Sequence, residues 1–160
     1  MTDFTQMLTG LPVLALAISS LLYLLTLRKA LARCADQSRE TSPNSVWLML
    51  IPIFQLGYHF VLVRQVSKSL GNELTRRGIA KAGVEPGKTL GLYMCILFVI
   101  VVCLSAFSSQ LGSTTGVTFL GLVQIAAWVC WILYWVEVAK SSAKIRGTLP
   151  VSPGTSLRAA

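Results

Sequence analysis

Four long runs of apolar residues dominate the chain. Short polar stretches separate these runs, which cover residues 11–27, 46–63, 89–111 and 117–138. A helix needs about 20 residues to cross the apolar core of a bilayer. The third and fourth runs meet that length, and the first nearly does. The pattern predicts an all-α integral membrane protein, with one membrane domain over residues 1–146 and a mobile tail over residues 147–160.

The second apolar run, residues 46–63, contains a break. Ile51 precedes Pro52 near its middle, and Gln55 and His59 follow. Proline removes a backbone donor, clashes with the preceding turn and disfavours helical angles in the residue before it. Two interpretations follow: a re-entrant segment that enters and leaves on the same side, or a kinked helix that spans fully. A re-entrant backbone is tolerated where neighbouring helices cover it.

An amphipathic helix follows the second run, over residues 64–77. Its apolar positions are Val63, Val66, Leu70 and Leu74, at steps of three and four residues. Polar residues, among them Glu73, fill the other faces. This spacing is typical of a helix with one buried stripe. We expect it to lie at the cytoplasmic surface.

The charges are unevenly distributed. The chain carries 14 Lys and Arg against 6 Asp and Glu, and its net charge is +8. Four full spans would place ten of the basic residues on one side and four on the other. A re-entrant second run would place all 14 on one side. The positive-inside rule favours the second arrangement, with the N-terminus outside and the C-terminus in the cytoplasm.

The composition excludes some classes of protein. Hydrophobic residues make up 54% of the chain and charged residues 12%, about half the charge of a typical soluble domain. That composition excludes a disordered chain and argues against a soluble enzyme. No nucleophile, P-loop or dinucleotide motif is present, and the basic stretch has no interleaved aromatic residue, as nucleic-acid binding would favour.

The cysteine and histidine content argues against a metal centre. The four cysteines form no C-x-x-C pair, and the chain has one histidine. A zinc site needs about four such ligands. We therefore predict packing thiols, no metal site and no cofactor.

Four polar residues within the apolar runs form a candidate intramembrane patch: Gln55, Tyr58, His59 and Gln124. On a continuous helix Gln55 and His59 are four residues apart and share a face. Polar side chains at membrane depth are costly unless they meet a partner or a cavity. The patch therefore predicts either the lining of a pocket or pore, or an interhelical hydrogen bond that holds the broken segment in place.

Two further sets of residues are candidates for contact with lipid or ligand. Trp128, Trp131 and Trp135 recur at steps of three and four, which predicts one aromatic helix face. Such a face suits a lipid, a quinone-like ligand or a partner helix, or it reflects packing and an interfacial aromatic belt. The basic residues after the second run are candidates for anionic headgroup contact. They are Arg64, Lys68, Arg76 and Arg77.

The second run resembles a pattern in small uncharacterised bacterial membrane proteins. Those proteins read Pro-x-x-x-Trp, then Ile-Pro-x-x-Asn, then a basic helix. Here Pro43, Trp47, Ile51 and Pro52 match that pattern, and Gln55 stands where Asn is commoner. The resemblance implies a bacterial cytoplasmic membrane and brings no assigned activity.

These observations favour a non-catalytic membrane component. We expect it to act by self-association or as an accessory subunit of a membrane complex. The alternative is a small oligomeric pore or transporter, which would require a ring of subunits because four short segments barely enclose an aqueous path. Under both hypotheses the partners are an anionic bilayer and another membrane protein or a second copy.

Overall fold

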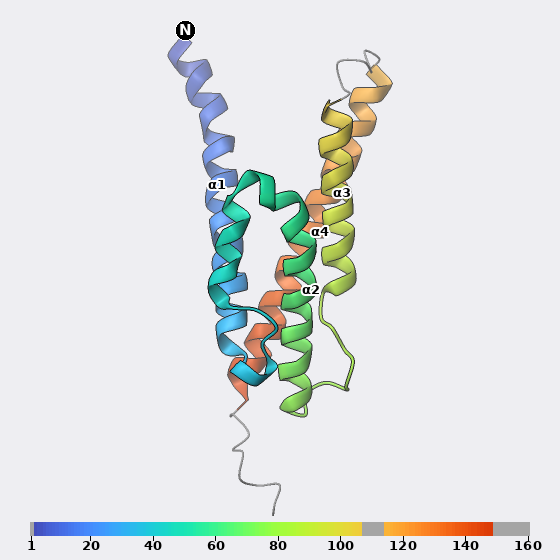
Figure 1. Ribbon diagram of the computed structural model, residues 1–160. Coiled ribbons are helices and arrows are strands. Elements are labelled where there is room, and N and C mark those ends of the chain that lie inside the picture. The colour runs from blue at the N-terminus through green and yellow to red at the C-terminus, as the bar shows by residue number, and fades with distance from the viewer. Residues whose placement is uncertain (1, 107–113, 149–160) are drawn as a thin grey trace, which may run out of the picture.

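The computed structural model describes residues 2–106 and 114–148 (Figure 1). Within these ranges every regular element is a helix, which confirms the predicted all-α class. In chain order the elements are α1 (Thr2–Arg33), η1 (Asp36–Ser38), η2 (Pro43–Leu50), α2 (Pro52–Arg76), α3 (Lys88–Ala106) and α4 (Thr114–Gly147). The two η elements are 3₁₀ helices. The predicted tail lies outside the described residues, apart from Gly147 and Thr148.

Three helical stretches are long and apolar enough to cross a membrane. They are Leu14–Arg33 in α1, Lys88–Ala106 in α3 and Gly116–Gly147 in α4. They correspond to the first, third and fourth apolar runs, and they indicate a multi-pass membrane protein. α1 and α4 continue past their apolar runs into basic last turns. Lys and Arg favour helix, and their charge is favourable near a helix C-terminus.

The second apolar run is divided at Ile51. η2 ends at Leu50, Ile51 is extended with φ −86° and ψ 112°, and α2 begins at Pro52. Proline suits the first helical position because its missing N–H would be unpaired there in any case. The chain reverses at this point, so that η2 and α2 lie side by side as a hairpin (Figure 1). Residues 46–63 are therefore not one continuous helix.

The ends of the bundle differ in charge. α1 and α4 begin at one end of the molecule, and α1, α2 and α4 all finish toward the other; a loop leads from that end part of the way back to the start of α3 (Figure 1). We call this second end, formed by residues 28–45, 64–88 and 140–148, the basic end. It carries every Lys and Arg of the described residues; the remaining one, Arg158, lies beyond them.

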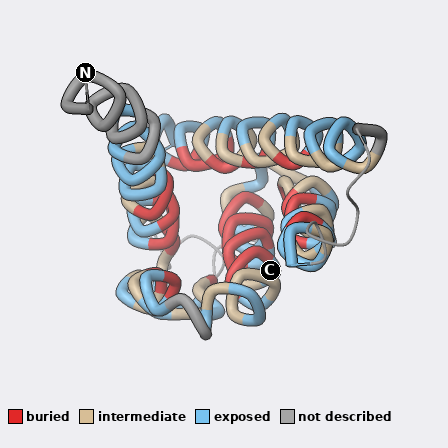
Figure 2. Tube along the Cα trace, turned by 90° about the horizontal axis from the view of Figure 1, so that it is seen from above, coloured by how far each residue is buried: buried red, intermediate tan, exposed pale blue. Residues whose placement is uncertain are grey.

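The core lies where the helices meet in this half of the bundle. The predicted apolar stripe of α2 is buried: Val63, Val66 and Leu70 have no exposed surface. Buried positions on each helix face inward (Figure 2). α3 can approach α2 and α4 closely because it has glycine at position 91. A Cβ at Gly91 would lie 2.4 Å from Val63 and 2.9 Å from the Tyr134 ring.

Candidate functional site

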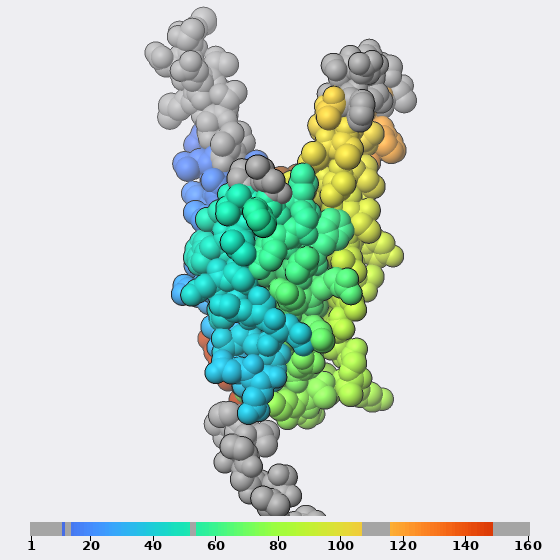
Figure 3. Space-filling view, in the orientation of Figure 1, coloured from blue at the N-terminus to red at the C-terminus, as the bar shows by residue number. Residues whose placement is uncertain are grey.

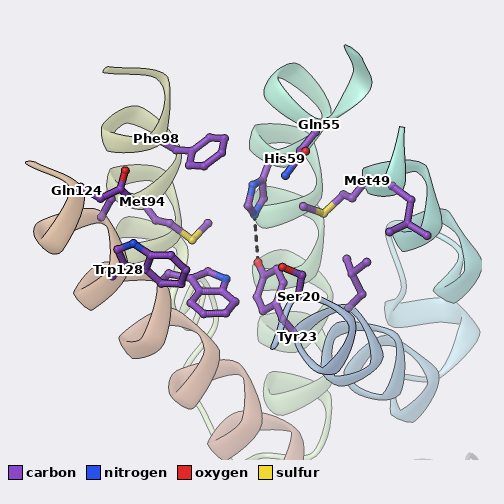
Figure 4. A pocket seen from close by; sticks show the side chains of 13 residues that line it. Ser20, Tyr23, Met49, Gln55, His59, Met94, Phe98, Gln124 and Trp128 are labelled. Atoms are coloured by element: carbon purple, nitrogen blue, oxygen red, sulfur yellow. Dashed lines mark hydrogen bonds between the residues drawn. The ribbon is translucent and has the colours of Figure 1, made fainter. Parts of the chain in front are cut away.

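A cavity of about 330 Å³ lies between the hairpin and the three long helices. The hairpin covers the face between α1 and α3 (Figure 3). Five elements contribute side chains to the cavity (Figure 4). The lining residues are Ser20, Tyr23 and Leu24 from α1, Met49 and Leu50 from η2, Gln55 and His59 from α2, Met94 and Phe98 from α3, and Gln124, Ala127, Trp128 and Trp131 from α4.

Two of the predicted polar residues lie on the α2 wall of this cavity. Gln55 and His59 are one helical turn apart and face the same space, as their spacing predicts. The hairpin positions them, because α2 starts only at Pro52 and Gln55 lies in its first turn. The His59 Nε2 atom and the Tyr23 hydroxyl oxygen are 3.2 Å apart and share a hydrogen bond. This bond joins α2 to α1 and is of the interhelical kind that the sequence suggests for the patch.

The side chains of Gln55 and Gln124 differ from that of His59 because they have no hydrogen-bond partner among the described residues. Only the Gln55 backbone is paired: its N–H donates to the Ile51 carbonyl oxygen at 3.0 Å. Figure 4 places them on opposite sides of the cavity, on α2 and α4. An amide carries two N–H donors and a carbonyl acceptor, and leaving such groups without a partner away from water costs about 1–3 kcal/mol. Each of these amides therefore has hydrogen-bonding capacity for a molecule in the cavity.

Aromatic rings form the α4 wall. The Trp128 and Trp131 rings meet edge to face, with centroids 5.4 Å apart, and the Tyr23 ring meets Trp131 at 5.6 Å. Edge-to-face pairs are a favourable geometry for aromatic side chains. The predicted aromatic face is thus partly a cavity wall. Trp135 belongs to the same face but does not line the cavity; its indole N–H donates to the Thr26 hydroxyl at 3.0 Å.

Below the cavity, toward the basic end, the bundle is closed. Leu27, Leu62 and Tyr134 have no exposed surface, and Tyr134 packs edge to face on Tyr23 of the cavity wall. Protein interiors packed in this way contain few voids larger than a water molecule. The cavity is therefore blind on this side within a single chain.

Sequence reasoning identified part of the lining and overlooked the rest. Tyr58, the remaining member of the predicted patch, packs against the core and does not line the cavity. The lining residues that were not singled out are Ser20, Tyr23, Leu24, Met49, Leu50, Met94, Phe98 and Ala127. Tyr23 carried the one available signal, because it is a polar aromatic residue in the middle of an apolar run.

A second polar feature lies at the basic end. Glu73 has no exposed side-chain surface, so the prediction that it lies on the polar face of its helix is wrong. Its carboxylate accepts hydrogen bonds from the Arg76 and Arg77 guanidinium groups at 2.7 Å and from the Ala35 backbone N–H at 3.2 Å. We call these four residues the Glu73 cluster. Arg77 in turn donates to the Ile145 and Thr148 carbonyl oxygens at 2.8 and 2.6 Å, which ties α2 to the end of α4.

Protonation within the Glu73 cluster follows from these contacts. Burial raises the pKa of the Glu73 carboxyl, but hydrogen bonds from Arg76, Arg77, Ser38 and the Ala35 N–H outweigh it and lower the pKa to about 2. Burial and the nearby Glu73 charge raise the pKa of the Cys34 thiol to about 12. Glu73 is therefore a stable anion, and Cys34 is a stable neutral thiol.

Three of the four predicted headgroup residues have partners within the protein. Arg76 and Arg77 pair with Glu73, and the Lys68 ammonium lies 3.0 Å from the Glu40 carboxylate. Arg64 is exposed and forms no ion pair with the described residues. Of this set, Arg64 alone has a charge that no described carboxylate neutralises.

The cysteines form neither a disulfide nor part of a metal site within the described residues. All four cysteines are free, and no group of three or more His, Cys, Asp or Glu side chains in the described ranges could hold a metal.

No protein-family model, no curated protein and no solved structure matches the chain.

Proposed function

We propose that this protein is a non-catalytic component of a bacterial cytoplasmic membrane that acts by association. It assembles with copies of itself or serves as an accessory subunit of a membrane complex. The blind cavity carries this proposal. Gln55, His59 and Gln124, the polar residues that suggest a conducting path, face one cavity, and a packed core closes that cavity toward the basic end. Such a space suits binding better than conduction.

The proposal includes an orientation in the membrane. The N-terminus lies outside, the C-terminus lies in the cytoplasm, and the η2–α2 hairpin enters the membrane from the cytoplasmic side as a re-entrant segment. The support is the basic end, where the described Lys and Arg residues gather and where both limbs of the hairpin begin and end. A single-sided positive charge is the arrangement that the positive-inside rule favours. Arg64, exposed and unpaired among the described residues, is the proposed contact for anionic headgroups.

Site-directed labelling tests this orientation. Single cysteines at Thr5 and Thr114, in a cysteine-free background, should react with an impermeant maleimide in intact cells. Cysteines at Gln37 and Ala82, which are exposed at the basic end, should react only after the cells are opened. Ser38 and Ser69 are poor positions because they are buried. Labelling of position 37 in intact cells would contradict the re-entrant hairpin.

The alternative is an oligomeric pore in which Gln55 and His59 line the conducting path. Planar-bilayer recording of the purified protein separates the two functions. We expect no single-channel current from the wild-type chain. A current that His59→Leu alters, while Tyr93→Phe on the exposed face of α3 does not, would overturn the proposal. The mass of the protein in mild detergent then shows whether association is with copies of itself.

A further inference from the structure

We infer that the cavity binds a neutral, membrane-soluble molecule whose head is a planar ring with oxygen atoms at opposite edges, which is the chemistry of a quinone or its quinol. This inference rests on the proposed function, because it names what the binding site of an associating membrane protein would hold. Three properties of the lining lead to it: its lack of charge, its rings and its two unpaired amides.

The lack of charge selects a neutral ligand. Among the described residues that line the cavity, none is Asp, Glu, Lys or Arg. The described lysines and arginines lie at the basic end, where Glu73 and Lys68 already have partners of opposite sign. Moving an ion into an apolar site without a counter-charge is strongly unfavourable. A phosphate headgroup, a carboxylate or a metal ion would find no compensating charge here.

The rings and the size of the cavity select a planar head. Trp128, Trp131 and Tyr23 present ring edges and faces to the space, and Phe98 from α3 adds a fourth ring. The volume of about 330 Å³ is at the small end for ligand pockets, which span roughly 300–1,000 Å³. It suits one substituted ring and excludes a whole lipid. Leu50 and Phe98 line the cavity and are also 55% and 37% exposed, so an apolar tail could leave at their side toward lipid.

The unpaired amides select oxygen atoms at opposite edges of that ring. Gln55 and Gln124 lie on opposite sides of the cavity (Figure 4), and their side-chain amides form no hydrogen bond with other described residues. A ring with two carbonyl oxygens in para positions could accept an amide N–H at each edge. An amide also accepts hydrogen bonds, so the same pair could hold the two hydroxyl groups of the quinol. An acyl chain would leave both amides without partners.

Quenching of tryptophan fluorescence tests the inference on the full-length protein. The probe is decylubiquinone, added to protein in nanodiscs of neutral lipid. We expect saturable quenching, because Trp128 and Trp131 lie in the cavity wall. Gln55→Leu and Gln124→Leu should each weaken binding by about tenfold, the scale of one lost hydrogen bond. Both variants retain all four tryptophans, so the fluorescence signal is comparable.

Matched controls define what would overturn the inference. Gln65→Leu makes the same change on α2 and should bind like wild type, because Gln65 does not line the cavity. It is a matched control because the Gln65 Oε1 atom also lacks a hydrogen-bond partner. Decylbenzene, which has a ring and tail but no oxygen, should not compete, and neither should dioleoylglycerol. Quenching that does not saturate, competition by decylbenzene, or wild-type affinity in Gln55→Leu would each refute it. Absence of quinone binding leaves the associating function intact, whereas a channel current would remove that function.

Discussion

At the basic end, the buried Glu73 carboxylate receives hydrogen bonds from two arginines and a backbone N–H. At the cavity, the side-chain amides of Gln55 and Gln124 receive none from the described residues. Both regions hold polar groups between helices, but the Glu73 carboxylate is satisfied within the protein and the two amides are not. A fully satisfied network holds elements together, whereas unpaired groups at a cavity lower stability and provide hydrogen-bonding capacity for a ligand. The difference separates a structural region from the region for which we propose binding.

The largest effect should follow removal of the Glu73 carboxylate. Glu73→Leu leaves Arg76 and Arg77 without their shared counter-charge, and breaking a buried pair in this way costs about 3 kcal/mol. Thermal unfolding in detergent measures the loss. Glu40→Leu, which removes the more exposed pair with Lys68, should cost less than about 1 kcal/mol. Equal losses of stability from the two variants would show that the buried Glu73 ion pairs contribute no more to stability than the exposed pair between Glu40 and Lys68.

Acid should weaken the same region selectively. The folded pKa of Glu73 is lowered to about 2 from an ordinary value of 4.5, so the unfolded chain binds more protons between these values. The stabilisation is complete above pH 4.5 and is lost as the pH falls through 2, by up to about 3 kcal/mol. Unfolding of wild type and Glu73→Gln at several pH values measures this loss. The two curves should converge on acidification; a constant gap would contradict the role of Glu73.

At the cavity, an apolar substitution should raise the stability of the protein rather than lower it. Gln124→Leu removes an unpaired amide, so we expect the free protein to gain about 1 kcal/mol in stability. The same variant should bind the quinone probe less well. Loss of stability in Gln124→Leu would mean that the amide is satisfied, and the contrast between the two regions would disappear.

The smallest effect concerns the one hydrogen bond that crosses the cavity wall. Tyr23→Phe and His59→Leu each remove the 3.2 Å contact between α1 and α2. A double-mutant cycle on thermal stability should give a coupling of about 0.6 kcal/mol, the average for membrane hydrogen bonds. Pairing His59→Leu with Tyr93→Phe, an exposed tyrosine on α3, should give no coupling. If the Tyr23→Phe and His59→Leu variants show no coupling, the hydrogen bond between the two residues does not stabilise the fold, and His59 only lines the cavity.

Sequence reasoning succeeded where a local pattern determines the structure. Hydropathy located the three candidate spans, Pro52 marked the division of the second run, and four-residue spacing placed Gln55 with His59. Each of these results depends on one helix at a time. The predicted apolar stripe of α2 was correct for the same reason.

The missed residues depend on how separate helices face each other. Met94 and Phe98 lie in a run that is apolar on all sides, so no periodicity marks the face that meets the cavity. The sequence alone assigns Glu73 to a polar helix face, because its contacts with Ala35 and Arg77 depend on how α2 packs against the segment after α1 and against the end of α4. Trp128 and Trp135 lie two turns apart on one face, yet only Trp128 lines the cavity, because α1 covers Trp135 through Thr26.

The contacts of α4 have a consequence for biosynthesis. α4 leaves the ribosome after α1, α2 and α3, yet it supplies one wall of the cavity, and its final turns accept hydrogen bonds from Arg33 and Arg77. Until α4 has entered the membrane, these guanidinium donors lack their native carbonyl partners and the cavity lacks its two tryptophans. A nascent chain that stops after α3 therefore has the hairpin but an incomplete cavity. The cavity closes on its fourth side only when α4 packs against the other helices.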